Sequence, residues 1–173
     1  MPVKFLSILL ALSLMLCAGC AQAATHTFSG LFSMEYDERV YALDTAAWLD
    51  ESDDVSRWLC MLSAENYLID VNMNQIEGWE HLSLIRPDDP MTSWYLEDML
   101  TDGVEHIGNV EAGGALFCLF RTSDADGEFL LGETVANGWA VSFYAYYDEP
   151  EKQTDTALEE ALKALLRTYQ PAK

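Results

Sequence analysis

Apolar and polar residues alternate in several segments of the chain, and each such segment predicts a strand. One face of FSGLFSMEY (28–36) carries aromatic residues, methionine and glycine while the other is mainly polar, so we expect a half-buried strand there and a shorter one at RVYAL (39–43). RWLCMLSA (57–64) and YLIDVNMNQI (67–76) predict a hairpin that turns at Glu65 and Asn66. Three more strands are expected at GALFCLFRTSD (114–124), EFLLGETV (128–135) and WAVSFYAYY (139–147), the last two joined by the turn-forming pair Asn137-Gly138.

Two further segments carry helical signals. An aspartate followed by a proline starts a helix predicted over 90–102, and Gly103 is a favourable stop. The closing segment TDTALEEALKALLRTY (154–169) contains a capping box formed by Thr156 and Glu159. Its apolar residues share one helix face, which we expect to pack on the sheet: Leu158, Leu162, Leu165, Leu166 and Tyr169.

The order of strands, helix, three strands and helix predicts a single α+β domain over residues 28–170, with a largely antiparallel sheet covered by helices. Four segments together resemble the PsbP-like family: GLFSMEYDE (30–38), VEHIGNVEAGGALFCLF (104–120), FLLGETVANGWAVSFYAYY (129–147) and LEEALKALLRTYQP (158–171). That family is an α-β-α sandwich shared by an extrinsic photosystem II subunit, a Ran-binding nuclear import factor and many bacterial lipoproteins. The resemblance implies the same sandwich here, but no single activity, because the family's functions are diverse.

The N-terminus has the pattern of an export signal. Lys4 precedes the apolar run FLSILLALSLML (5–16), which is too short to span a membrane core of about 30 Å. The residues Ala18, Gly19 and Cys20 match a lipobox, which predicts a signal peptide over 1–19 and a lipid on Cys20. A short tether over 20–27 would then lead into the domain.

A second cleavage signal overlaps the first. Ala21-Gln22-Ala23 fits the small-x-small rule, so cleavage could remove residues 1–23 and leave a chain that begins at Ala24. We favour lipidation, which predicts an extracytoplasmic protein anchored to the cell membrane. The alternative is a secreted or periplasmic protein without an anchor.

Charge narrows the range of partners. The chain has 29 acidic and 9 basic residues and a net charge of −20, and the only charged side chain of the leader is the basic Lys4. Such a domain repels phosphate backbones, which argues against a nucleic-acid partner. Acids cluster in LDESDD (49–54), PDD (87–89) and YDEPE (147–151). Solubility outside the cytoplasm is the simplest explanation; a cationic partner, a cation-rich wall polymer or a salty habitat are the alternatives.

The cysteines and histidines indicate no metal centre. Cys60 and Cys118 lie in apolar, strand-like runs, where cysteine usually acts as a small hydrophobic residue. Export permits a disulfide between them, and the sequence leaves that question open. The three histidines are scattered and the predicted domain has no CxxC motif, so we expect no zinc site and no cofactor.

One segment partly matches a calcium-binding loop. In TSDADGEFLLGE (122–133), Asp124, Asp126 and Glu133 stand at the third, fifth and twelfth positions of an EF-hand loop. Thr122 replaces the aspartate of the first position, and the flanking segments predict strands rather than helices. A hairpin turn is therefore the favoured interpretation, and a calcium site is the weaker alternative.

Aromatic residues are the better candidates for a binding surface. Trp94 falls on the polar side of the predicted helix over 90–102, away from its apolar residues. Tyr144 and Tyr146 alternate with Phe143 and Ala145 and should face away from the core. Aromatic side chains flanked by acids suit sugar rings or basic peptides.

No catalytic motif accompanies these residues: the sequence has no GxSxG, no glycine-rich phosphate loop and no isolated pair of carboxylates in an apolar run. We therefore expect no catalytic residues and a non-enzymatic binding or scaffolding module of the bacterial cell envelope, with a cationic or carbohydrate partner. The alternative is a secreted hydrolase that acts on envelope polymers.

Overall fold

The computed structural model describes residues 23–28, 31–45, 56–75, 90–136 and 138–172. The predicted signal peptide and the lipidation candidate Cys20 lie outside these residues. Within them the chain forms these elements in order: β1 (Ala23–Phe28), β2 (Phe32–Asp37), β3 (Ala42–Asp44), β4 (Ser56–Ser63), β5 (Tyr67–Gln75), α2 (Pro90–Met99), β6 (Glu105–Ala112), β7 (Ala115–Asp124), β8 (Gly127–Ala136), β9 (Trp139–Tyr147), α3 (Thr156–Leu166) and β10 (Gln170–Pro171).

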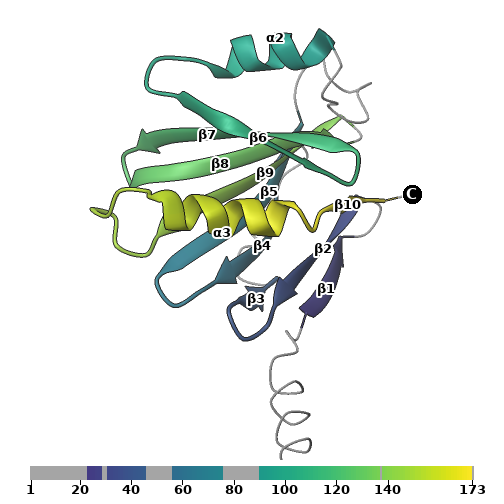
Figure 1. The fold of residues 1–173 in the computed structure, drawn as a ribbon, viewed down its shortest axis with the longest axis vertical. Coiled ribbons are helices and arrows are strands. Elements are labelled where there is room, and N and C mark those ends of the chain that lie inside the picture. The colour runs from purple at the N-terminus through teal and green to yellow at the C-terminus, as the bar shows by residue number, and fades with distance from the viewer. Residues whose placement is uncertain (1–22, 29–30, 46–55, 76–89, 137, 173) are drawn as a thin grey trace, which may run out of the picture.

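Two antiparallel sheets organise these strands. The larger has seven strands in the order β3-β4-β5-β9-β8-β7-β6, and the smaller has three in the order β1-β2-β10. Figure 1 shows α3 lying across the seven-stranded sheet, with the smaller sheet beside its C-terminal end and α2 near β6 and β7. No helix among the described residues has the length and apolar character needed to cross a membrane.

The predicted α+β fold, an α-β-α sandwich, is wrong. Strands make up 58% of the described structure and helices 16%, so this is a β-rich fold of two antiparallel sheets. The reason is that segments near the two ends of the domain pair with each other: β10 joins β2. Phe28, Phe32 and Met34 of the smaller sheet enter the same core as the leucines of α3. A sheet thus covers part of the face that we expected helices to cover alone.

The face of the seven-stranded sheet that packs against α3, here called the α3 face, holds the larger core. Burial of each leucine of α3 contributes roughly 1.5–3 kcal/mol, and the predicted apolar face is confirmed because these residues are buried: Leu158, Leu162, Leu165, Leu166 and Tyr169. Gly132 of β8 allows α3 to approach closely, since a Cβ there would lie 2.7 Å from Leu166 Cδ1. Four aromatic rings contact one another beneath the helix: Phe32, Phe117, Phe143 and Tyr169.

The opposite face, here called the α2 face, is apolar at one side and polar at the other. Tyr95 of α2 packs there with the buried residues Leu116, Cys118, Phe120, Leu131 and Val135. Further along the sheet the face becomes polar, where Asn72 of β5, Ser142 of β9 and Glu133 of β8 stand side by side on neighbouring strands. Cys60 belongs to the core of the α3 face, so the two cysteines lie on opposite faces, and both are free thiols.

Several element predictions are confirmed and others need correction. The hairpin of β4 and β5 and the run of β7, β8 and β9 occur as expected. The strand predicted over 28–36 is wrong, because the chain reverses and Phe28 pairs with Phe32. Helix α2 ends at Met99, before Gly103. Helix α3 is capped one residue earlier than predicted, by Asp155, whose carboxylate accepts a hydrogen bond from the backbone N–H of Leu158.

Candidate functional site

A pocket of about 380 Å³ opens where the β7–β8 turn meets the loop between β9 and α3. Six carboxylates line it: Asp70, Asp124, Asp126, Glu128, Asp148 and Glu149. Three tyrosines also line it: Tyr144, Tyr146 and Tyr147. The only cationic side chain among its lining residues is Lys152. The walls therefore combine aromatic surface with a strong excess of negative charge.

Asp70 of β5 orders the part of the pocket that lies on the α2 face. Its carboxylate accepts hydrogen bonds from the hydroxyl of Tyr146 at 2.6 Å and from the indole N–H of Trp58 at 3.2 Å. Burial, together with this hydrogen bond to Asp70, raises the pKa of Tyr146. The neighbouring Asn72 also lines the pocket, and its side-chain oxygen is buried without a hydrogen-bond partner in the described part of the chain. The pocket floor thus keeps one unused acceptor.

Tyr147 orders the opposite wall. Its hydroxyl donates a hydrogen bond of 2.7 Å to Asp155, the residue that caps α3. The backbone N–H of Leu158 and the Tyr147 hydroxyl hold the pKa of Asp155 below its usual value. Burial and the Asp155 carboxylate raise the pKa of Tyr147 to about 12. The ammonium of Lys152 lies 3.4 Å from the centre of the Tyr147 ring, within the range of a cation–π interaction.

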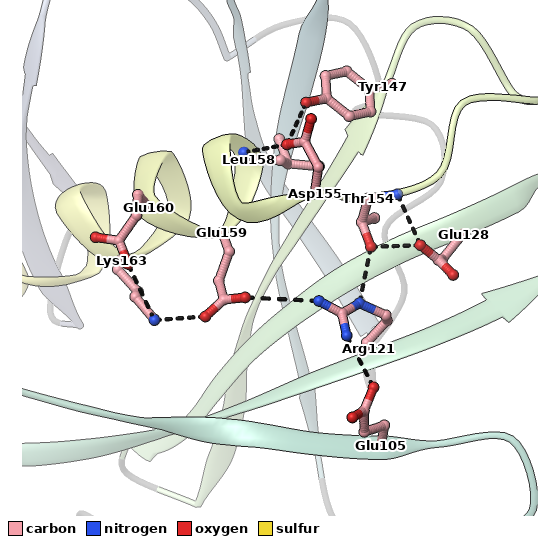
Figure 2. A network of polar contacts seen from close by, with 10 residues as sticks. All are labelled: Glu105, Arg121, Glu128, Tyr147, Thr154, Asp155, Leu158, Glu159, Glu160 and Lys163. Atoms are coloured by element: carbon pink, nitrogen blue, oxygen red, sulfur yellow. Dashed lines mark hydrogen bonds and ion pairs between the residues drawn. The ribbon is translucent and has the colours of Figure 1, made fainter.

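The loop that forms the pocket rim is held in place on both sides (Figure 2). Glu128 accepts hydrogen bonds from the backbone N–H of Thr154 at 2.7 Å and from its hydroxyl at 2.5 Å, and Arg121 Nε donates to the same hydroxyl at 3.1 Å. Gly127 has a φ of +135°, and a Cβ there would lie 2.8 Å from the carbonyl oxygen of Pro150. The rim is therefore preorganised, which reduces the ordering cost of binding.

The basic residues beside the rim are already paired with acids. Figure 2 shows Arg121 between two carboxylates, with Glu105 at 2.9 Å and Glu159 at 3.6 Å. Lys163 of α3 pairs with Glu159 at 2.6 Å and with Glu160 at 3.2 Å. Neither Arg121 nor Lys163 lines the pocket, so Lys152 alone among the lining residues offsets the charge of the six carboxylates.

The structure brings together four of the residues predicted for a site. Tyr144 and Tyr146 line the same pocket as Asp124 and Asp126, although the sequence placed the two pairs in separate hypotheses. Trp94 is not among the residues that line this pocket; it is on α2, and 64% of its surface is exposed.

Glu133, the third residue predicted for a calcium site, lies outside the pocket. Glu133 of β8 is only 6% exposed, and its carboxylate accepts hydrogen bonds from the hydroxyls of Tyr95 at 2.5 Å and of Ser142. Asp124 pairs with Gly127 where β7 turns into β8, so the segment forms a hairpin rather than an EF-hand loop. Among the described residues, no group of three or more His, Cys, Asp or Glu side chains is arranged to hold a metal ion.

The other residues that line the pocket were not predicted as site residues from the sequence, and three of them show why. Asp70 carried a usable signal, because it alternates with the apolar residues of β5 and so had to share a face with Tyr144, its cross-strand partner. Tyr147 and Lys152 carried none, because their positions depend on how the β9–α3 loop folds.

Comparison with known proteins gives no independent guide: no protein-family model matches the chain, and no curated protein matches it either. The resemblance to the PsbP-like family stays a prediction.

Proposed function

We propose that this protein is an exported, lipid-anchored module of the bacterial cell envelope that binds a positively charged ligand in the pocket between the β7–β8 turn and the β9–α3 loop. The observation that carries the proposal is the combination of six carboxylates with three tyrosines in one preorganised pocket. Carboxylates attract a cation, and tyrosine faces stabilise it through their ring quadrupole. A volume of about 380 Å³ lies at the lower end of the range for small-molecule sites.

Hydrogen bonds to carboxylates strengthen the attraction of two tyrosine rings for a cation. Tyr146 donates its hydroxyl hydrogen to Asp70, and Tyr147 donates to Asp155. A phenol that donates to a carboxylate gains electron density in its ring, which makes the ring face more attractive to a cation. A neutral sugar can donate hydroxyl hydrogens to carboxylates but does not neutralise their charge, so the excess of negative charge favours the cationic partner over the carbohydrate partner.

The alternative function, a hydrolase, fits this site less well. Acid–base hydrolysis needs two carboxylates with different pKa values that converge on one substrate bond. Burial raises the pKa of Glu133, but Tyr95 and Ser142 occupy its carboxylate, and it does not line the pocket. The carboxylates that do line the pocket are suited to attracting a cation.

Isothermal titration calorimetry with spermine tests the binding proposal. We expect the mature protein to bind spermine and to show no heat with chitobiose, a neutral sugar. Asp70→Asn should weaken spermine binding by about three- to tenfold, because it removes a pocket charge and replaces the charged acceptor of the Tyr146 hydroxyl with a neutral amide oxygen. Asp98→Asn is the matched control, since it makes the same change on the exposed surface of α2. Equal effects of the two variants, or tight binding of chitobiose alone, would contradict the proposal.

Anchoring is tested separately by mass spectrometry of the mature N-terminus. We expect a diacylglyceryl group on Cys20. Strand β1 begins at Ala23, inside the segment predicted as a tether, so only two residues would separate the lipidated cysteine from the domain. A mature chain that begins at Ala24 would end the lipoprotein proposal while leaving the pocket proposal intact.

A further inference from the structure

Lys152 lies in the pocket as an internal ligand would. Its side chain is partly buried, it lines the pocket, and its ammonium is 3.4 Å from the centre of the Tyr147 ring. We propose that the ring of Tyr147 forms an ammonium subsite, which Lys152 occupies in this structure and which the primary alkylammonium of an external ligand takes over on binding. This inference rests on the proposed function and specifies the class of ligand.

The chemistry of the subsite selects an organic ammonium rather than a metal ion. The face of an aromatic ring attracts a cation without supplying the oxygen ligands that Ca²⁺ requires. The hydrogen bond from Tyr147 to Asp155 enriches the ring that faces the ammonium. Asp148 and Glu149, which also line the pocket, supply carboxylates that can accept the N–H hydrogens of a primary ammonium. A quaternary ammonium has no such hydrogens and would use the ring alone.

Lys152 is held weakly enough to be displaced. Within the described residues its ammonium forms no ion pair and attracts the Asp155 carboxylate only from a longer distance, whereas Lys163 is paired with both Glu159 and Glu160. The backbone of the loop is fixed independently, since the N–H of Lys152 donates to the carbonyl of Glu149 at 3.0 Å. The side chain can therefore leave the ring without unfolding the rim. Its replacement by a ligand exchanges one cation–π contact for another and adds the ligand's contacts to the rest of the pocket.

Two sources could present this group: a free diamine, or the side chain of a lysine within a peptide. Both end in an unbranched chain with a primary ammonium. The probes are therefore 1,5-diaminopentane and N-acetyl-lysine-N-methylamide, with tetramethylammonium and Ca²⁺ as comparison cations. We expect both primary ammonium probes to bind more tightly than tetramethylammonium at the same ionic strength, and their relative affinities identify the source.

The decisive variant is Lys152→Met, which removes the internal competitor and keeps a long apolar side chain. Because a cation–π contact contributes little at exposed sites and more when desolvated, we expect 1,5-diaminopentane to bind about 2- to 30-fold more tightly. Arg167→Met is the matched control: it changes the net charge equally on an exposed residue that does not line the pocket. Lys152→Arg restores a cation and should return the affinity toward that of the wild type.

Nuclear magnetic resonance can follow the displacement of the Lys152 side chain from the Tyr147 ring directly. The ring of Tyr147 shields protons above its face, so the Hε signals of Lys152 should lie upfield in the free protein and move downfield as the probe binds. Equal tightening in Lys152→Met and Arg167→Met, weaker binding in Lys152→Met, or binding of Ca²⁺ alone would overturn the inference. If neither the wild type nor Lys152→Met binds any cation, the proposed function fails as well; if the wild type binds spermine but Lys152→Met is unchanged, only the inference fails.

Discussion

Replacing Glu133 with glutamine should have an effect on stability that depends on pH. Relative to the wild type, the variant should gain free energy of unfolding as the pH rises from acidic to neutral. The Glu133 carboxylate is buried beneath α2, where it accepts hydrogen bonds from the hydroxyls of Tyr95 and Ser142. Burial penalises the ionised form and raises its pKa, while the two hydroxyl donors offset part of this effect. Glutamine keeps an acceptor for Tyr95 and offers an N–H to Ser142 without carrying a charge.

The direction of this pH dependence follows from proton linkage. The folded-state pKa of Glu133 lies above the unfolded value of about 4.5, so between these two values the folded protein binds more protons than the unfolded chain. The stability contributed by protonated Glu133 is fully present below the unfolded pKa, and it is lost as the pH rises through the folded pKa. The loss is about 1.4 kcal/mol for each unit by which the two pKa values differ. The advantage of Glu133→Gln over the wild type should therefore grow between pH 5 and pH 8, by about 1.4 kcal/mol for each pH unit by which the folded-state pKa lies above 5.

Urea unfolding followed by tryptophan fluorescence measures this difference. Comparing variant with wild type at each pH cancels the titration of the other acids, which dominates the absolute stability of a chain with a net charge of −20. Glu111→Gln is the control, because Glu111 is exposed on β6, and its effect should change by less than about 0.5 kcal/mol over the same range. A difference between Glu133→Gln and wild type that is the same at pH 5 and pH 8 would refute the reasoning.

Three further predictions concern packing and exposure. Gly132→Ala should lower the free energy of unfolding by about 1–3 kcal/mol in urea, because its Cβ would lie 2.7 Å from Leu166 Cδ1, a methyl group confined by the buried core; an unchanged stability would mean that the Leu166 side chain or α3 can shift away. Trp94→Ala should change the free energy of unfolding by less than about 0.5 kcal/mol, because 64% of the side chain is exposed; a larger loss in the same assay would show that the indole is packed. Cys60 and Cys118 should react with Ellman's reagent only after unfolding, because both thiols are buried and burial raises the pKa of Cys118 to about 12; rapid reaction of the folded protein would contradict this.

Local patterns predicted the centre of the larger sheet because its strands are adjacent in sequence. The β4–β5 and β8–β9 hairpins are closed by short turns, and the alternation along β5 and β9 defines both faces even though β4 has a bulge between Trp58 and Cys60. The apolar face of α3 was also predictable from a local pattern, because Leu158, Leu162 and Leu165 lie at helical spacing.

The smaller sheet was not predictable in the same way. Phe28 and Phe32 face each other across a hairpin, and opposite residues of an antiparallel pair point to the same side. The alternation therefore continues through the turn and imitates one long strand. Strand β6 was missed because a bulge between His106 and Gly108 interrupts its alternation. The pairing of β10 with β2 joins segments more than 130 residues apart, which no local pattern reveals.

The site was predictable only in part. Tyr144 and Tyr146 were identified because their alternation with Phe143 and Ala145 shows which face of β9 they occupy, but the expectation that both face away from the core is wrong for Tyr144, which packs against the apolar cluster of the α2 face. The other wall depends on the β9–α3 loop, and that loop is positioned by contacts of Glu128 with Thr154, a residue distant in sequence. The position of Lys152 over Tyr147 follows from this tertiary arrangement and could not be read from its neighbours in the chain.

A titration of the mature protein with 1,5-diaminopentane, monitored by amide chemical shifts, shows whether a cation binds in the pocket between the β7–β8 turn and the β9–α3 loop. Because the whole acidic surface attracts cations, the position of the shift changes distinguishes binding in the pocket from non-specific binding. We predict shift changes that are concentrated in the β7–β8 turn, the end of β9 and residues 148–155 and that saturate with one binding constant. Small, unsaturable changes spread over exposed acids, or changes centred on α2 around Trp94, would contradict it.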